Sequence, residues 1–290
     1  MTQAVAAFKP LQICTTIQET RAASHAARSA GERIGFVPTM GALHEGHLSL
    51  VRAASTSCGV VTASIFVNPT QFGPNEDLAK YPRSFERDRE WLEKEGVDVL
   101  FAPSAEEMYP AGAVTWVTVE GLSEKLDGRS RPGHFRGVTT VVAKLFHIVE
   151  PDVAFFGQKD AAQVAIVRRM VRDLNLAIEI VVCPIVREPD GLAMSSRNAY
   201  LDTDQRKKAL ALHRSLIRVQ EAIRGGEKNS HKLIEVGRAE FANEPSVRLD
   251  YFEIVNAERL DPVKSVSSGA LVAVAAYVGS TRLIDNLLVD

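Results

Sequence analysis

The sequence contains few cysteines and almost no excess charge, and both shortages exclude classes of protein. Its three cysteines, Cys14, Cys58 and Cys183, are an odd number without C-x-x-C spacing, which argues against a disulfide framework and against a zinc ribbon. The 34 Lys and Arg side chains nearly balance the 36 Asp and Glu side chains, so the net charge is −2. A chain without an overall positive field is poorly suited to polyanions and anionic bilayers, and we expect no nucleic acid and no membrane among its partners.

Long apolar runs and several nucleotide-binding motifs are also lacking. No stretch reaches the ~18 apolar residues of a membrane span, and the beginning, MTQAVAAFKPLQIC, has no basic region ahead of a long apolar run. Neither G-x-x-x-x-G-K-[ST] nor a G-x-G-x-x-G after a strand occurs, so P-loop kinases and dinucleotide-dependent dehydrogenases lose their main support. With 46% hydrophobic and 24% charged residues, we expect a cytoplasmic, soluble globular protein.

The first two thirds of the chain alternate short β-branched runs with amphipathic stretches. Ile34–Pro38 and Val60–Val67 are typical of buried strands, and His47–Cys58 between them has helical spacing of apolar residues, which together predict a βαβ unit. This alternation predicts an α/β fold: a Rossmann-like parallel sheet with helices on both faces. The further predicted elements are strands Val97–Phe101, Val153–Phe156 and Ile178–Val182 and helices Arg83–Glu95, Gly137–Val149 and Ala161–Leu174.

After Pro184 the pattern changes to that of a smaller α+β unit. Two helices, Thr203–Arg224 and His231–Ala242, follow a loop. Three strands come next without helices between them, which predicts antiparallel pairing: Val247–Val255, Ala270–Val278 and Arg282–Val289. We therefore expect two domains, residues 1–184 and residues 185–290.

Ligands of a parallel sheet bind beyond the carboxyl ends of its strands. The loop after the first predicted strand gives the clearest indication of such a ligand site. In Pro38–His47 (PTMGALHEGH), His44 and His47 lie three residues apart, with Gly46 allowing close backbone approach. The start of the following helix favours phosphate through its free N–H groups and its dipole. Metal ligation is the alternative interpretation of His-x-x-His, but no nearby third ligand supports it.

Three further segments carry weaker signals. Asn68–Gly73 offers carboxamides for a small polar ligand or forms an ordinary turn. Tyr81 could close over a pocket, and Asp88 either holds a hydrated Mg²⁺ or lies on a solvated helix face. Lys125–Arg136 contains four Lys or Arg against one acidic residue and is either an anion clamp or a solvated basic loop.

Two later segments supply cationic groups near predicted helix starts. Gly157 permits close approach of a ligand, Lys159 supplies a point charge, and Asp160 is a ligand contact or a helix cap. Met194–Arg197 places two hydroxyls and a guanidinium at the predicted domain junction, where they either bind the oxygens of a triphosphate or cap a helix.

Together these segments resemble the pantothenate synthetase family. His44-Glu-Gly-His47 resembles the His-x-Gly-His signature of the nucleotidylyl transferase superfamily, and Met194–Arg197 resembles its mobile Lys-Met-Ser-Lys-Ser-type loop. The wider set, PTMGALHEGH, FVNPTQF, RPGHFRGV, FGQKDAAQ and VREPDGLAMSSRN, is similar to that family in order and over nearly the whole chain. The resemblance implies ATP-dependent condensation of (R)-pantoate with β-alanine through a pantoyl adenylate, with release of pyrophosphate and AMP, a requirement for Mg²⁺, and a homodimer formed through the N-terminal domain.

The resemblance also implies roles for individual residues. His44, His47, Lys159 and Arg197 would act in catalysis, with His47 as proton donor. Gln71 and Gln163 would hold pantoate, and Gln71 would also meet β-alanine. The ATP site would be lined by Met40, Gly41, Ala42, Leu43, His44, Glu45, Gly46, His47, Gly157, Gln158, Lys159, Asp160, Val186, Met194, Ser195, Ser196 and Arg197.

One position departs from the family pattern, and two other functions stay open. Gln158 stands where the family commonly has an acidic or basic residue. The smaller domain would act as a lid that keeps water from the adenylate.

A nucleotidylyl transferase for another acceptor, such as a cofactor phosphate or tRNA, is the alternative enzyme, and a nucleotide-binding regulatory module is the alternative without catalysis.

Overall fold

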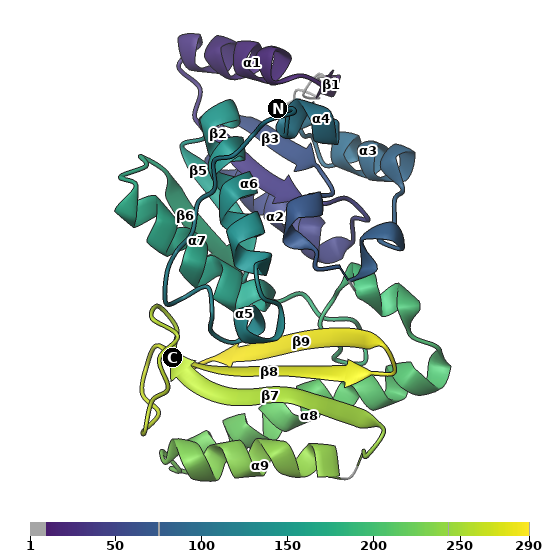
Figure 1. Cartoon of the computed structure of the whole chain (residues 1–290), viewed down its shortest axis with the longest axis vertical. Helices are drawn as coiled ribbons and strands as arrows, with labels where there is room; N and C mark the ends of the chain where they lie inside the picture. Colours follow the sequence, from purple (N-terminus) through teal and green to yellow (C-terminus); the bar gives the residue numbers. More distant parts are fainter. Residues whose placement is uncertain (1–9, 75, 243, 290) are drawn as a thin grey trace, which may run out of the picture.

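The first part of the chain forms a six-stranded parallel sheet with the order β1-β4-β3-β2-β5-β6 (Figure 1). The computed structural model describes residues 10–74, 76–242 and 244–289. β2 and β5 are continuous apolar runs, as expected for strands that are covered on both faces. This arrangement confirms the Rossmann-like sheet predicted from the sequence. Its strands are β1 (Gln12–Cys14), β2 (Ile34–Thr39), β3 (Val60–Ile65), β4 (Val99–Phe101), β5 (Val153–Gly157) and β6 (Glu179–Cys183).

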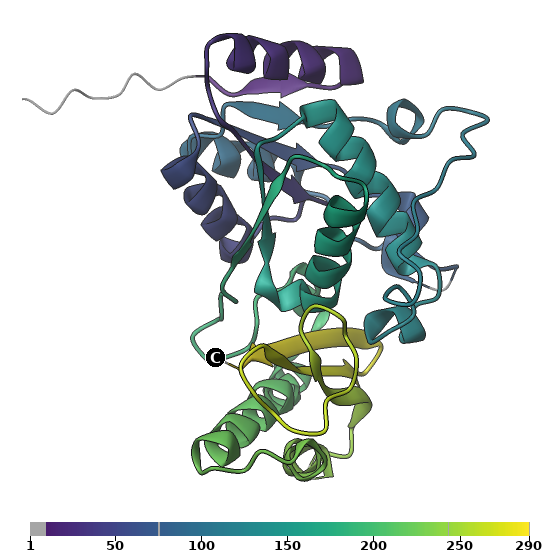
Figure 2. The same cartoon turned by 90° about the vertical axis from the view of Figure 1, so that its left-hand side faces the viewer.

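Helices cover both faces of this sheet (Figure 2). Side chains alternate along each strand, so Phe36 of β2 packs into a core with α1, α6 and α7, whereas its neighbour Val37 packs into a second core with α2 and α3. The helices of this part are α1 (Ile17–Ser29), α2 (Glu45–Ser57), α3 (Phe85–Lys94), α4 (Ala105–Met108), α5 (Asp127–Ser130), α6 (His134–Val149) and α7 (Ala161–Asp173).

The edge strand β1 and helix α1 are not among the elements predicted from the sequence. The buried side of α1 consists of Thr20, Ser24 and Ala27, which are small or polar and give no apolar periodicity. The helix begins at a capping box in which the Thr16 side chain accepts from the Glu19 backbone while the Glu19 carboxylate accepts from the Thr16 backbone. Local capping and small-residue packing therefore form a helix that hydrophobic pattern alone does not indicate.

The C-terminal part is a three-stranded antiparallel sheet of order β7-β8-β9, also as predicted. Val272 and Val274 of β8 pack toward α8 and α9, whereas Ala273 and Ala275 on the opposite face join the core of the first part. β9 is the strand of this sheet nearest the first part (Figure 1). Among the described residues, no helix is both long and apolar enough to cross a membrane. The elements are α8 (Thr203–Arg224), α9 (Ser230–Ala242), β7 (Val247–Asn256), β8 (Ala270–Val278) and β9 (Thr281–Leu288).

The strand order creates a crevice between β2 and β5. These strands are hydrogen-bonded neighbours, but the chain continues from β2 to β3 on one side and from β5 to β6 on the other. The connections therefore leave in opposite directions, and the space beyond the carboxyl ends of the two strands stays open. The loops after Thr39 and Gly157 flank this space.

Candidate active site

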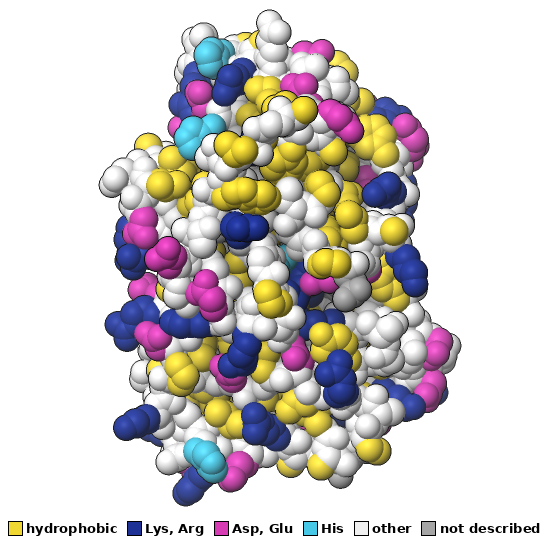
Figure 3. Space-filling view, viewed as in Figure 1, with side chains coloured by type: hydrophobic (Ala, Val, Ile, Leu, Met, Phe, Trp, Pro, Cys, Tyr) yellow, Lys and Arg dark blue, Asp and Glu magenta, His cyan; other side chains and the backbone are white. Residues whose placement is uncertain are grey.

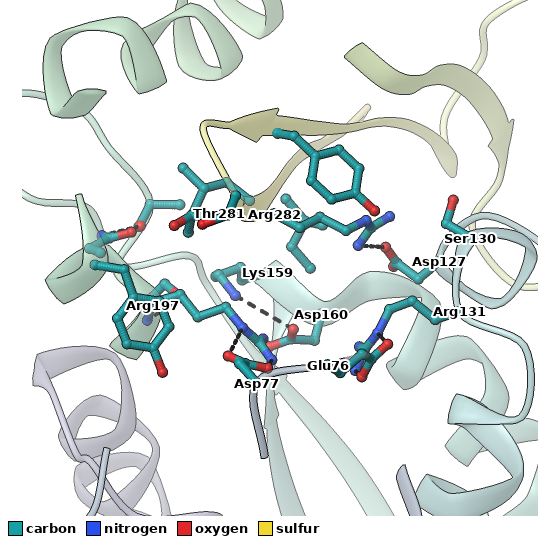
Figure 4. A pocket seen from close by; sticks show the side chains of 18 of the residues that line it. Glu76, Asp77, Asp127, Ser130, Arg131, Lys159, Asp160, Arg197, Thr281 and Arg282 are labelled. Atoms are coloured by element: carbon teal, nitrogen blue, oxygen red, sulfur yellow. Dashed lines mark hydrogen bonds and ion pairs between the residues drawn. The ribbon is translucent and has the colours of Figure 1, made fainter. Parts of the chain in front are cut away.

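Two adjoining cavities lie beyond the carboxyl ends of β2 and β5. The inner cavity, of about 230 Å³, is lined by residues of the loop after β2. The outer cavity, of about 880 Å³, extends to β9 of the C-terminal part. Figure 4 shows the outer cavity with charged side chains of both signs converging on it, and Figure 3 shows charges of both signs dispersed over one face of the molecule. Both cavities are lined by Arg131, His134, Lys159, Asp160, Gln163, Ser195 and Arg197.

The loop between β2 and α2 is held by the carboxylate of Asp88. Its two oxygens accept hydrogen bonds from the backbone N–H groups of Ala42 at 2.6 Å and Leu43 at 3.0 Å. Gly41 and Ala42 both have positive φ angles, so the loop needs this support to keep an uncommon backbone conformation. Asp88 is 0% exposed, which rules out the solvated helix face considered for it, and neither cavity includes it in its lining. Its role in this structure is to shape the histidine loop.

His44 and His47 form a close pair of rings, tilted by 41° to each other, at the beginning of α2. Their ring centroids are 4.1 Å apart, and both rings line the inner cavity. The backbone N–H of His44 donates to Nδ1 of His47 at 3.3 Å, so in the neutral ring the proton lies on Nε2. Gly46 is required here, because a Cβ at this position would lie 2.9 Å from Cε1 of His44. The loop thus presents an N–H donor of His47 at the start of a helix.

Both imidazoles are held in the neutral form. Burial lowers the pKa of His44 to about 4, and the positive charge of Lys159 acts in the same direction. Burial also holds the pKa of His47 well below its usual range, with His44 and Lys159 adding to the effect. At neutral pH the pair therefore offers hydrogen-bond donors and acceptors, and the fixed positive charge comes from Lys159.

Lys159 lies between the end of β5 and the start of α7. Its Nζ is 3.5 Å from a carboxylate oxygen of Asp160, and its side chain is 20% exposed at the cavity wall. The neighbouring Gly157 faces open space, since a Cβ built there would have no atom within 4 Å. The segment therefore combines a cation with bare backbone, an arrangement that suits phosphate oxygens.

Arg197 and Tyr81 bring the loop after β6 against the first part of the chain. Arg197 makes a two-pronged ion pair with Asp77, both N–O distances being 2.9 Å. Burial opposes the charge, but Asp77 outweighs it and raises the pKa of Arg197 above its usual value. The hydroxyls of Tyr81 and Ser196 are 3.2 Å apart, and Tyr81 is 6% exposed. The guanidinium is thus fixed and fully charged at the boundary of the two cavities.

Gln71 and Gln163 both line the inner cavity, from the short helix after β3 and from the first turn of α7. Oε1 of Gln71 accepts from Asn68 at 3.0 Å, and its backbone carbonyl contacts Nδ1 of His134 at 2.8 Å. An apolar wall that the sequence analysis did not assign to the site completes the cavity. It consists of Val138, Val141, Val142 and Leu145 of α6 together with Phe66.

The basic segment 125–136 does not form one anion clamp. Arg131 makes a two-pronged pair with Glu76 at 2.8 and 2.6 Å, and Arg129 pairs with Glu253 of β7. Lys125 pairs with Asp261 at 2.7 Å, and Arg136 lies over the ring of Trp116. The structure therefore does not bring the whole segment together as a clamp, because Lys125, Arg129 and Arg136 line neither cavity and are engaged with other residues. Among the four cations and the histidine of this segment, Arg131 and His134 are the ones that line the cavities.

The residues implied by the family resemblance divide into two groups. Most of them line the inner cavity, including Met40, Val186 and Met194, but Gly41, Ala42, Leu43, Glu45 and Gln158 line neither cavity. Glu45 pairs with Arg52 on the surface, and the Gln158 amide binds Asn286 of β9 at 2.9 Å. The Asn286 contact was missed by the sequence analysis, although two adjacent polar residues inside the last predicted strand were a usable signal.

Comparisons with known proteins identify the family of this chain. The family model described as pantoate-beta-alanine ligase matches residues 12–288. A pantothenate synthetase of Koribacter versatilis is 61% identical over 280 residues, covering 97% of this chain and 96% of its own. One from Acidobacterium capsulatum is 65% identical over 255 residues, covering 88% and 85% of the two chains.

Solved structures give the same result. A crystal structure of pantothenate synthetase from Thermus thermophilus is 48% identical with a TM-score of 0.91 and covers 96% of this chain and 99% of its own. A pantoate-beta-alanine ligase from Francisella tularensis, complexed with beta-gamma ATP and beta-alanine, is 35% identical with a TM-score of 0.76, covering 96% and 97%. The fold and the family match therefore define the chain as a ligase. The chain belongs to the pantoate-beta-alanine ligase family, which confirms the enzyme activity expected from its sequence motifs.

Proposed function

We propose that the chain activates pantoate as an adenylate in the inner cavity and then transfers the pantoyl group to β-alanine. The observation that carries this proposal is that one cavity gathers His47, Lys159 and Arg197 with the two glutamines. Attack of a carboxylate on the α-phosphate brings two anions together, so cationic groups and aligned N–H donors must stabilise the charge. A side-chain nucleophile is not needed for this reaction.

Each side of the cavity has a distinct part in the first half-reaction. Gln71 and Gln163 supply carboxamides for the hydroxyl and carboxylate groups of pantoate, and the apolar wall of α6 covers its dimethyl carbon. Lys159 and Arg197 bind the phosphates, which replace or share the contact of Arg197 with Asp77. Because its pKa is depressed, His47 acts through its neutral Nε2–H as a hydrogen-bond donor to a phosphate oxygen, in place of the proton transfer implied by the resemblance.

In the second half-reaction the amine of β-alanine attacks the activated carbonyl, and AMP leaves. We propose that β-alanine enters through the outer cavity, which adjoins the inner one along the residues they share and is lined by charges of both signs. A zwitterion carries both charges and meets partners of each sign there. The C-terminal part covers this entrance, which supports its assignment as a lid.

Magnesium would arrive with the phosphates of ATP. Within the part of the chain that the structure describes, no group of three or more His, Cys, Asp or Glu is placed to hold a metal ion. Mg²⁺ commonly keeps several waters and binds substrate phosphates with one or two carboxylates, so Asp160, which lines both cavities, fits this need. When bound, the ion would neutralise phosphate charge in the transition state.

The assembly and location follow from other parts of the chain. We propose a homodimer formed through the first part, supported by Val114 at 83% exposure and Trp116 at 44% in the segment before α5. Sedimentation of the protein as a monomer at assay concentration would exclude the homodimer.

The three free cysteines support a reducing, cytoplasmic location. We further propose that the two parts are domains divided at residue 184.

The test of the proposed mechanism is pantoate-dependent exchange of radiolabelled pyrophosphate into ATP without β-alanine. The adenylate mechanism predicts exchange that requires pantoate, and AMP release that requires β-alanine as well. Folded protein without such exchange would contradict it. Stable retention of an adenylylated product in place of AMP release would instead identify a nucleotidylyl transferase acting on another acceptor.

A further inference from the structure

Strand β9 contains two adjacent polar residues, Asp285 and Asn286, in a mostly apolar sheet. They are 3% and 4% exposed, so their polar groups need partners inside the protein. Each finds its partner in a different segment of the candidate ATP site. The backbone N–H of Asn286 also donates to the Asp285 carboxylate at 2.8 Å, which holds that carboxylate against the strand's own backbone.

Asn286 holds the backbone that carries Lys159. Its Nδ2 donates to the carbonyl of Gln158 at 3.0 Å and to the carbonyl of Lys159 at 2.9 Å, and its Oδ1 accepts from the Gln158 side chain at 2.9 Å. Two consecutive carbonyls on one donor fix the two peptide planes on either side of the Lys159 Cα. The side chain of Lys159 therefore leaves the backbone in a direction set by a residue more than a hundred positions later in the chain.

Asp285 holds the other phosphate-binding segment. Its carboxylate makes a two-pronged pair with Arg187 at 2.7 and 3.0 Å, and the same guanidinium donates to the carbonyl of Gly191 at 3.1 Å. Arg187 pairs with Ala193 across a β-bridge, and the N–H of Met194 donates to Val186 at 3.0 Å. This small hairpin leads directly into Ser195–Arg197, so its position sets where Arg197 lies.

We propose that Asp285 and Asn286 are positioning residues that hold the Lys159 segment and the Ser195–Arg197 segment in register for adenylate formation. This inference rests on the proposed function of those two segments. The cations that must act together on one triphosphate come from both parts of the chain, and the adjacent side chains of β9 join them. The C-terminal part is then a structural half of the ATP site in addition to a cover over it.

The first test is the isosteric variant Asn286→Asp, measured by pantoate-dependent pyrophosphate exchange. It keeps an acceptor for Gln158 but replaces the donor to two carbonyls by an oxygen. A displacement of the reacting groups by about 1 Å costs up to about 100-fold, so we expect exchange to fall by about 10- to 100-fold. The dissociation constant for pantoate should stay within about twofold, because the hydrogen bonds of the Asn286 side chain go to Gln158 and Lys159 and not to the two glutamines proposed to hold pantoate.

Two matched variants separate positioning from general stability. Gln158→Ala removes only the side-chain hydrogen bond to Asn286 and leaves both carbonyl contacts, so it should keep exchange within about threefold. Asp261→Asn weakens an ion pair to Lys125 that also joins the two parts of the chain but lies on the surface, and it should not change exchange. Asp285→Asn should lower exchange and raise the KM for ATP.

The outcomes decide the matter separately from the proposed function. Wild-type protein without pantoate-dependent exchange would remove the proposed function itself. Wild-type exchange together with an Asn286→Asp rate within about threefold of it would overturn only the positioning role. Equal losses in Asn286→Asp and Asp261→Asn would also overturn it, because they would indicate general loosening. If Asn286→Asp does not fold, Asn286→Ala, which removes the donor without adding repulsion, takes its place with the same expectations.

Discussion

Acid should destabilise this protein through His134, and the size of the effect follows from its contacts. Nδ1 of His134 contacts the backbone carbonyl of Gln71 at 2.8 Å, and Nε2 faces Nη1 of Arg131 at 2.9 Å. A carbonyl requires a donor and a guanidinium requires an acceptor, so the neutral ring carries its proton on Nδ1. A second proton on Nε2 would face the N–H of Arg131. Burial and the Arg131 charge accordingly lower the pKa of His134 from 6.5 to about 4.

The sign and magnitude follow by linkage. The folded-state pKa lies below the unfolded value, so the unfolded chain binds the proton first, and stability falls as the pH drops from 6.5 toward 4. At pH 5 the unfolded imidazole is almost fully protonated and the folded one is about one tenth protonated, which corresponds to a loss of about 2 kcal/mol relative to pH 7.5. His44 and His47 act in the same direction, so the wild-type loss is larger than this share.

Equilibrium unfolding in urea at pH 7.5 and pH 5 measures the effect. His134→Gln should lose about 2 kcal/mol less than wild type between the two pH values, although it is less stable at both. His231→Gln, at a histidine whose side chain is 82% exposed, is the matched control and should follow wild type. If His134→Gln shows the same pH dependence as wild type, the assignment of a neutral, Arg131-bound imidazole is wrong.

Two further predictions concern the chemistry and the shape of the inner cavity. Lys159→Ala should lower the single-turnover rate of adenylate formation by at least about 100-fold, because the lysine stabilises negative charge in the transition state. Pantoate affinity, measured by calorimetry, should stay nearly unchanged, and equal losses in the rate and in the affinity would contradict this role. Gly137→Ala should destabilise the protein by about 1–3 kcal/mol in chemical denaturation and raise the KM for pantoate, because the added Cβ would lie 2.4 Å from the carbonyl of Thr70 and 2.6 Å from Cα of Gln71. A Gly137→Ala protein with wild-type stability and KM would show that this contact relaxes without moving Gln71.

The elements of the fold that the sequence predicts are those whose signal is local. β2 and β5 are unbroken apolar runs, and α8 begins and ends at Thr203 and Arg224, as predicted, because Asp202 caps it and Gly225 follows it. The strand order has no such local signal, because nothing in the residues of β2 specifies that β5 lies beside it. β1 and α1 escaped prediction because one is three residues long and the other buries small or polar side chains.

The candidate site shows the same division. Local motifs locate His44, His47, Lys159 and Arg197, because loops after parallel strands converge at one edge of the sheet. They do not reveal how the charges are used. Arg129 and Arg131 are typical of an anion clamp in the sequence, yet Glu253 and Glu76 neutralise them. Such pairs join residues far apart in the chain, and only the folded structure determines them.

The histidines, with depressed pKa values, and Arg197, with its full positive charge, contribute differently to the proposed binding of phosphate. If His44 and His47 were protonated, ATP would be bound tightly in its ground state, and the positive charge would persist after pyrophosphate had left. In the proposed mechanism the neutral rings instead supply oriented hydrogen bonds without charge and Lys159 and Arg197 supply the charge, with Asp77 as the partner of Arg197 when no phosphate is bound. A site with only Lys159 and Arg197 as cations binds pyrophosphate less tightly than a site in which both histidines were also charged. Weaker binding favours release of pyrophosphate before β-alanine arrives.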